Sequence, residues 1–366
     1  MATSLAPTVQ LNLTQTESYT TTLFPETIVS DNLWKYLGII ILVLGTLGHT
    51  LSITVMVASK TMRVQSSTIY LIAMSIAGIL TLYTGLLRYF IFIGINGWTD
   101  DLRNLSHAGC KLHFMLTYAS LQYFAWMQAT VACDRLISVL SPHTYMLSCK
   151  WKIALIVALI ELTLVVSLNV AVLVSVGHND EGYCIPTAID FWFDVWGYID
   201  LVSFSLLPAF IMIICNSVIL VILKKSKMRT SSSSNVARSL TVMLMALNVL
   251  FLITTLPISV IFFLNWGTFG ERHYAITELC WTIFSLLQYA GSAGTFFVYC
   301  FTGSKFREEL FALPTTLCGF KSIKVAAQSR KSSAVSNKSR AMLTEPKNTN
   351  TCKNYRSLSI TDETDA

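Results

Sequence analysis

The sequence predicts an all-α protein, a bundle of seven transmembrane helices, from two observations. Hydrophobic residues make up 53% of the 366-residue chain and charged residues only 13%, an apolar excess too large for an ordinary soluble domain. The apolar residues also gather into seven long runs, and each run can cross the roughly 30 Å hydrocarbon core as a helix of about 20 residues. The runs are Leu37–Ala58, Thr68–Ile93, Cys110–Leu140, Trp151–Val176, Val195–Leu223, Leu240–Leu264 and Ala275–Phe301.

These runs divide the chain into four parts. The parts are an extracellular tail at 1–36, the seven-helix bundle at 37–301, a short amphipathic helix at 302–318 and a flexible cytoplasmic tail at 319–366. The start, "MATSLAPTVQ", shows no cleavable signal peptide, so the first run is expected to act as an uncleaved anchor. The short helix is expected to lie parallel to the membrane, because Phe306, Leu310 and Leu313 share one apolar face.

Lysine and arginine gather on one side of the expected membrane. The first, third and fifth connections are basic, whereas the alternate connections and the N-terminal tail lean acidic. Because basic loops stay in the cytoplasm, we expect the N-terminus outside and the C-terminus inside. The net charge of +6 therefore indicates topology at the plasma membrane rather than nucleic-acid binding, and no aromatic-basic signature for nucleic acid occurs.

The side of the membrane on which a cysteine lies determines whether it can form a disulfide. Cys110 and Cys184 face the oxidising outside, together with Cys280 near the outer end of the seventh run. A disulfide between Cys110 and Cys184 would tie the third helix to the second outer loop, and two free thiols are the alternative.

Three further positions are candidates for modification. Asn12, in "NLT", and Asn104, in "NLS", lie in outer segments and are predicted glycosylation sites. Cys318 follows the amphipathic helix and is a candidate for palmitoylation.

The stretch "ATVACDRLISVLSP" places Asp134 and Arg135 at the end of the third run. Arg135 follows Cys110 by 25 residues. Pro208 lies in the fifth run, "FLITTLP" holds Phe251 and Pro257 in the sixth, and "TFFVYCFTGSKFREEL" holds Tyr299 in the seventh. In order and spacing these features resemble the rhodopsin-like (class A) G-protein-coupled receptors. The wording "TTLPISV" and "FFVYC" is most similar to divergent FMRFamide-receptor-like peptide receptors.

The resemblance implies a switch at the inner end of the bundle. Asp134 would hold Arg135 in a partly desolvated pair, and Arg135 would face a G protein when the helices part. Pro257 would kink the sixth helix so that it swings as a lever near Phe251, with Tyr299 on the seventh helix. The alternatives are a snorkelling arginine and a static kink.

The chain departs from the family where the family binds sodium. Gly78 stands in place of the sodium-binding aspartate, Phe124 in place of a hydroxyl, and His49 in place of a first-helix asparagine. A buried cation needs oxygen ligands, and Gly78, Phe124 and Thr295 offer one hydroxyl among them. We therefore predict no sodium effect on agonist affinity.

The ligand is expected to bind among the outer halves of the helices. Arg88 and Asp200 are charged residues at that depth, and each could bind a ligand or pair with the other. Further lining residues, for which helix packing is the alternative role, are Tyr118, Gln122, Phe262, Trp281, Gln288 and Tyr289. Thr117 replaces the aspartate of aminergic receptors, which argues against a monoamine, and the absence of lysine from the seventh run excludes a retinal Schiff base.

These observations predict a receptor, with no enzymatic activity, cofactor or metal, that binds an extracellular peptide, most naturally a neuropeptide, and activates a heterotrimeric G protein. Arrestin could bind the phosphorylated tail, and membrane lipid surrounds the bundle. The alternatives are a small-molecule chemosensory receptor, a receptor-shaped protein that does not signal, and a channel or transporter. The last would favour inverted repeats or broken helices, which the sequence does not show.

Overall fold

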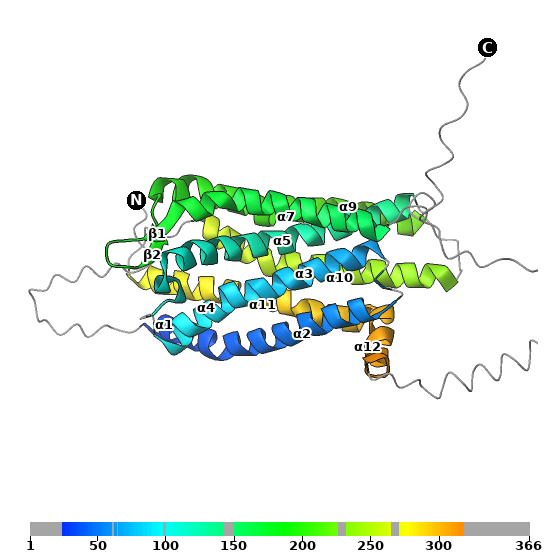
Figure 1. Cartoon of the computed structure of the whole chain (residues 1–366), viewed down its shortest axis with the longest axis horizontal. Coiled ribbons are helices and arrows are strands. Elements are labelled where there is room, and N and C mark those ends of the chain that lie inside the picture. The colour runs from blue at the N-terminus through cyan, green and yellow to red at the C-terminus, as the bar shows by residue number, and fades with distance from the viewer. Residues whose placement is uncertain are drawn as a thin grey trace, which may run out of the picture.

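The computed structural model describes residues 24–60, 62–63, 65–97, 100–141, 150–225, 232–264 and 271–317. Long helices lie side by side in these ranges and form one bundle, with a two-stranded sheet at one end (Figure 1). The all-α bundle expected from the apolar runs is confirmed.

Each apolar run lies within one helical rod, except that Val176, the last residue of the fourth run, begins strand β1 (Val176–His178). The first rod contains α1 (Pro25–Asn32) and α2 (Gly38–Ala58); the second contains α3 (Ser66–Thr81) and α4 (Leu87–Tyr89); the third is α5 (His107–Leu140) and the fourth α7 (Lys150–Ser175). The fifth contains α8 (Gly197–Asp200) and α9 (Leu207–Lys225), the sixth is α10 (Ser232–Leu264), the seventh is α11 (Glu271–Thr302), and α12 (Ser304–Leu317) follows.

Six of the rods are long and apolar enough to cross a membrane by themselves. The remaining rod is α5, whose 34 residues span about 51 Å at 1.5 Å per residue. It contacts α3, α7 and α9, so much of its surface faces protein rather than lipid. This central position explains why α5 carries more polar side chains than its neighbours and still completes a seven-helix membrane bundle.

The two ends of the bundle differ, and we name them by their residues. At the disulfide end, Cys110 of α5 is bonded to Cys184, as the sequence predicted, with an S–S distance of 2.02 Å. Cys184 begins strand β2 (Cys184–Pro186), which pairs antiparallel with β1 (Val176–His178). Gly182 turns the loop between the strands with a φ of +83°, a conformation that glycine adopts without strain. The opposite end, which holds Asp134 and Arg135, is the arginine end.

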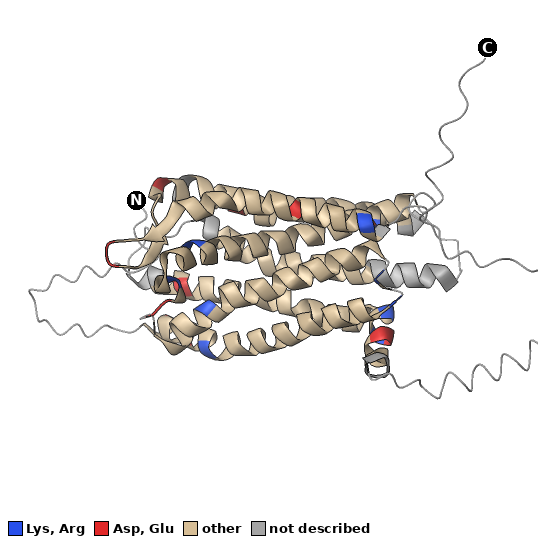
Figure 2. Cartoon of the chain, in the orientation of Figure 1, with Lys and Arg blue, Asp and Glu red and all other residues tan. Residues whose placement is uncertain are grey.

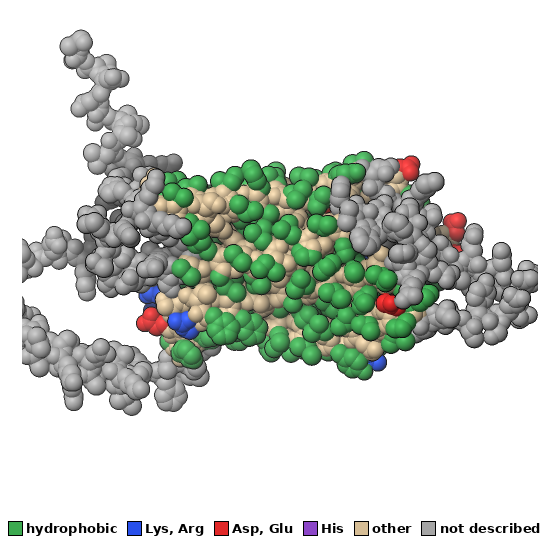
Figure 3. All heavy atoms as spheres, turned by 180° about the vertical axis from the view of Figure 1, so that it is seen from behind, with side chains coloured by type: hydrophobic (Ala, Val, Ile, Leu, Met, Phe, Trp, Pro, Cys, Tyr) green, Lys and Arg blue, Asp and Glu red, His purple; other side chains and the backbone are tan. Residues whose placement is uncertain are grey.

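The outer surface of the bundle is apolar between these ends. Most charged residues lie towards the two ends (Figure 2), and hydrophobic side chains cover the middle of the face in Figure 3. On this belt Leu164 and Val174 of α7 are 63% and 68% exposed, and Phe210 of α9 is 61% exposed. Surface of this kind is stable against lipid and not against water.

The first rod begins earlier than expected. Residues 25–36, placed by the sequence in the tail, are helical and pack on α11. Trp34 is fully buried and donates its indole N–H to Thr282 Oγ1 at 3.1 Å. The Ser30 hydroxyl lies 2.7 Å from the same oxygen, so a hydrogen-bonded contact between distant segments extends the helix beyond the apolar run.

Three of the described rods, the first, second and fifth, contain π-helical stretches. Leu201–Leu206 is π-helical and ends just before Pro208, which lacks an amide N–H and crowds the carbonyl one turn back. Pro257 lies inside α10, so it cannot donate to the carbonyl of Ile253.

Candidate functional site

The arginine end holds a compact polar cluster. Asp134 Oδ2 accepts a hydrogen bond from Arg135 Nη2 at 2.8 Å, and both side chains are about 10% exposed. Both residues are also tied to the start of α3, because Ser66 Oγ donates to Asp134 Oδ1 at 2.7 Å and Arg135 Nη2 donates to Ser67 Oγ at 2.5 Å. The structure thus contains the predicted ion pair. It also shows hydrogen bonds from this pair to Ser66 and Ser67, here called the serine clasp, which the sequence did not indicate.

The other predicted switch residues lie in the adjoining core. Phe251 of α10 is 5% exposed and meets Phe204 edge-on, with ring centroids 6.4 Å apart. Tyr299 of α11 is fully buried, and its ring lies 5.3 Å from that of Phe306 on α12. Among the described residues the Tyr299 hydroxyl has no hydrogen-bond partner. These side chains therefore connect the fifth rod, α10, α11 and α12 through one core.

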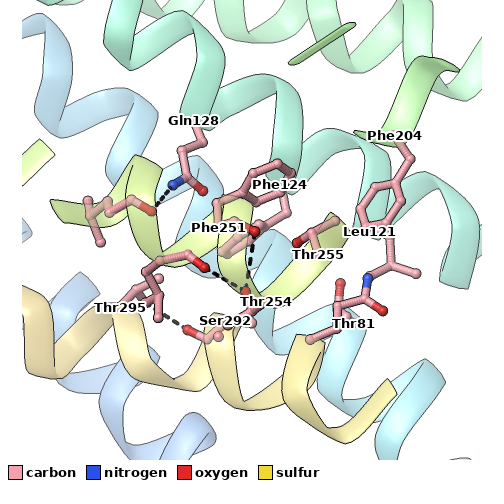
Figure 4. A pocket seen from close by; sticks show the side chains of 14 residues that line it. Thr81, Leu121, Phe124, Gln128, Phe204, Phe251, Thr254, Thr255, Ser292 and Thr295 are labelled. Carbon is pink, nitrogen blue, oxygen red and sulfur yellow. Dashed lines mark hydrogen bonds between the residues drawn. The ribbon is translucent and has the colours of Figure 1, made fainter. Parts of the chain in front are cut away.

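A small cavity lies between α5, α10 and α11 (Figure 4). Its volume is about 20 Å³, room for roughly one water molecule. Gln128 Nε2 donates to the carbonyl of Leu247 at 2.6 Å, and Thr254 Oγ1 donates to the carbonyl of Leu250 at 2.9 Å. The described residues that line the cavity carry hydroxyl and amide groups and no carboxylate.

His49 fills the space next to Gly78. The imidazole is 1% exposed, and its Nε2 lies 3.2 Å from Ser292 Oγ on α11. A Cβ added to Gly78 would clash with the His49 ring. An imidazole therefore occupies the volume that an aspartate at position 78 would need, which gives a structural reason for the predicted insensitivity to sodium.

We expect Gly78→Ala to lower the free energy of unfolding by about 1–3 kcal/mol, because the new methyl group overpacks against His49. His49→Ala removes the ring, so the double variant should recover most of the loss. Thermal unfolding of the four proteins of this cycle measures the coupling between the two sites. Additive effects of the two substitutions would contradict direct contact.

Arg88 belongs to an ion cluster at the disulfide end. Its Nη2 lies 2.5 Å from Asp101 Oδ2, and Arg103 Nη2 lies 2.7 Å from the same oxygen. Arg88 also stacks over Tyr89 and Phe92, at 4.5 and 5.4 Å from the ring centroids. Burial alone would raise the pKa of Asp101, but the two guanidinium groups outweigh it and hold that pKa well below its usual range.

Asp200 does not pair with Arg88, so that alternative from the sequence is wrong. Asp200 Oδ1 instead accepts from Gln122 Nε2 at 2.9 Å, and Gln122 Oε1 accepts from Asn169 Nδ2 at 2.7 Å. Arg88 pairs with Asp101 instead, and none of the ion pairs between described residues includes Asp200.

The predicted aromatic lining is split between two clusters. Trp281 and Tyr289 of α11 surround Trp34, at ring-centroid distances of 5.7 and 6.4 Å. Tyr118 of α5 lies instead against Trp192 and Trp196, at 5.8 and 5.6 Å. Gln288 lines the central cavity. The predicted ligand residues thus lie at three places in the bundle, and the side chain of Phe262 lies outside the described residues.

The remaining predicted positions are partly described. Asn104 lies at the disulfide end, where its Oδ1 accepts from the backbone N–H of Cys184 at 2.8 Å. Glu161, a charged residue inside the fourth run, accepts a hydrogen bond from Thr130 of α5. Asn12 and Cys318 lie outside the described residues, so their modification stays a prediction.

Several contacts were missed because no local signal marks them. Asp101 lies in a loop that leans acidic, and Asn169 lies in an almost wholly apolar run. One signal could have indicated Asn169. It is the only amide side chain in the fourth run, and a polar group is costly in such apolar surroundings.

The family description "7 transmembrane receptor (rhodopsin family)" matches residues 48–294, more than half of the chain. The chain belongs to this family. The receptor is therefore a multi-pass membrane protein that responds to an extracellular ligand and signals through G proteins. None of the curated proteins compared with the receptor matches it significantly.

The segment that matches the family includes features from both ends of the bundle. The matched segment begins at Gly48 in α2 and ends at Gly294 in α11, so it covers the disulfide, the Asp134–Arg135 pair and every residue that lines the central cavity except Thr295. The receptor carries these features on the expected helices, while His49 and Gly78 distinguish its core from the pattern described above.

Proposed function

We propose that the receptor binds an extracellular neuropeptide at the disulfide end and activates a heterotrimeric G protein at the arginine end. The proposal includes the predicted orientation at the plasma membrane, with the N-terminus outside. The observation that carries it is the Asp134–Arg135 pair, clasped by Ser66 and Ser67 at one end of a bundle whose family is established.

The switch would work by exchange of partners. In the described structure Asp134 and the serine clasp keep the Arg135 guanidinium against the bundle. A guanidinium is always charged and presents a planar set of donors, so it can serve carbonyl oxygens of an inserted helix once α10 moves outward. Phe251 and Pro257 on α10 lie between the ligand end and this arginine and would transmit the movement.

A peptide fits the disulfide end better than a small enclosed ligand does. An open hollow of about 460 Å³ lies there, lined by residues 187–191 next to β2, whereas the cavity inside the bundle has room for roughly one water. An open surface that includes Phe191, whose ring lies 6.4 Å from that of Trp196, suits an extended chain whose side chains enter pockets.

The same proposal covers the modifications and later partners. We expect the receptor at the membrane to carry glycans on Asn12 and Asn104 and a palmitoyl chain on Cys318. We also expect arrestin to bind its phosphorylated tail. A glycan on the Asn104 amide nitrogen is compatible with the bond that its Oδ1 makes to Cys184.

A neuropeptide library applied to cells that express the receptor tests the ligand class. We expect at least one peptide to produce a second-messenger response, and we expect Arg135→Ala to abolish the response without reducing surface expression. A tissue extract provides the second arm, because peptidase treatment should remove its activity. Activity that survives digestion would favour the small-molecule alternative, and ion flux without a nucleotide-exchange signal would favour a transport protein.

A further inference from the structure

Asp200 is a carboxylate inside the bundle with only an amide for a partner. It lies on α8, and its Oδ1 accepts from Gln122 of α5. Gln122 is fully buried and is oriented in turn by Asn169 of α7. The two amides point their donors in one direction, from α7 through α5 towards the carboxylate, so they favour a negative charge at that point.

The position of Asp200 on its helix directs it inward. Trp196 and Phe204 lie four residues to either side and share its face, and both are buried, at 0% and 7% exposure. Phe204 also lines the central cavity. The Asp200 side chain therefore points into the bundle, above that cavity, and not towards lipid.

The second carboxylate oxygen remains open. Among the described residues, Oδ2 has no hydrogen bond, and it is not among the enclosed polar atoms that lack a partner. The three ion pairs of the described residues use Asp101 and Asp134. An intramembrane carboxylate without a cation is costly, so a cation that comes from outside the chain would stabilise it.

The local backbone is irregular in the same place, as it is in the second rod, where α4 also lies between two π-helical stretches. α8 has only four residues and lies between two π-helical stretches, Phe191–Trp196 and Leu201–Leu206. Pro208 accounts for the second stretch, but the first has no proline. Single π-helical turns occur frequently at functional sites, because they re-aim the side chains that follow.

Aromatic faces complete the surroundings. Tyr118 lies close enough to Asp200 for an electrostatic interaction, and its ring meets Trp196 edge-on at 5.6 Å. The Trp196 indole N–H is buried and has no acceptor among the described residues. A carboxylate beside electron-rich rings is the usual environment for an ammonium or guanidinium group.

Arg88 provides the contrast. Asp101 already accepts from Arg88 and Arg103 through both carboxylate oxygens, so the charge of Arg88 is satisfied within the protein. Of the two charged residues that the sequence placed at ligand depth, only Asp200 is left for a ligand.

We propose that Asp200, with Tyr118 beside it, forms a cation subsite that selects ligands carrying an ammonium or guanidinium group. This inference rests on the receptor function proposed above and adds the charge of the ligand to it. For a peptide ligand, the group is the side chain of arginine or lysine or the free N-terminus.

Purified full-length receptor in lipid nanodiscs tests the subsite without knowledge of the natural ligand. The probes are phenethylguanidine and phenethylamine, with 3-phenylpropanol as the neutral match. We expect each cationic probe at ten times its dissociation constant to raise the unfolding temperature by roughly 2 °C, and the neutral probe to leave it unchanged. Failure of both cationic probes to shift the unfolding temperature at the highest soluble concentration would overturn the proposal.

Substitutions separate the subsite from general binding. Asp200→Asn should abolish the shift, and Asp200→Glu should retain part of it, which controls for loss of folding. Asp180→Asn is the matched control, because Asp180 is an exposed acid in the loop between β1 and β2, and the shift should persist. A shift that survives Asp200→Asn shows that the cation binds elsewhere and sinks the proposal.

Any peptide that activates the receptor gives a second, distinguishable test. Exchange of its arginine for citrulline, a neutral isostere, should reduce potency at least tenfold in the wild type and have little further effect in Asp200→Asn. An active peptide whose potency ignores this exchange and exchange of its other cationic groups would leave the peptide-receptor function intact and refute the cation subsite alone.

Discussion

Replacement of Cys110 and Cys184 together by serine is expected to lower the free energy of unfolding by roughly 2–4 kcal/mol and to remove most receptor from the cell surface. The disulfide closes a loop across 74 positions and joins α5 to β2. The unfolded protein without it gains conformational freedom, although helices that remain in the membrane limit the gain, so the estimate stays within the usual range for soluble proteins.

Surface labelling of intact cells and thermal unfolding of purified receptor measure the two effects. Cys133→Ser with Cys215→Ser is the matched control, because these two cysteines are free although their sulfurs lie 3.7 Å apart. The control should keep near-normal surface levels. Equal loss in both double variants would show that the Cys110–Cys184 bond has no special role.

Substitution of Asp101 by asparagine should destabilise the receptor by about 3 kcal/mol, the cost of removing one member of a buried ion cluster. The change leaves the guanidinium groups of Arg88 and Arg103, which are 7% and 15% exposed, without their shared carboxylate. Asp100→Asn is the control, since Asp100 is exposed and should tolerate the change. Similar unfolding temperatures for both variants would contradict the cluster.

The same cluster predicts a pH dependence. The pKa of Asp101 is lower in the folded receptor than in the unfolded chain, so its ionisation adds stability at pH values above the unfolded pKa of about 4. That stability is lost as pH falls below about 4 towards the folded pKa. In Asp101→Asn the unfolding temperature should therefore fall less between pH 5 and pH 3 than in the wild type, and an equal fall in both would argue against the linkage.

The sequence predicts well whatever depends on neighbouring residues. Apolar runs define the helices because each must match the thickness of the bilayer, and Asp134 and Arg135 are adjacent, so their pairing needs no knowledge of the fold. Cys110 and Cys184 were paired through their compartment, which the charges of the loops indicate.

Contacts between distant helices could not be predicted in the same way. The Asp200–Gln122–Asn169 chain joins three helices, and its members are recognisable only once the helices are rotated against one another. His49 and Gly78 each departed from the family pattern, but their mutual fit is a matter of volume. Arg88 pairs with Asp101, which lies in a connecting loop. In a loop the sequence pattern says least about where a side chain points.

The rate of GDP release from purified heterotrimeric G proteins tests the central claim most directly. Receptor in nanodiscs would be compared with Arg135→Ala, each with representatives of every Gα class and with an activating peptide or peptide pool. The account predicts faster release with at least one heterotrimer and loss of that acceleration in Arg135→Ala, whose unfolding temperature and disulfide stay close to normal. Acceleration that persists without Arg135, or none with any heterotrimer, would contradict it.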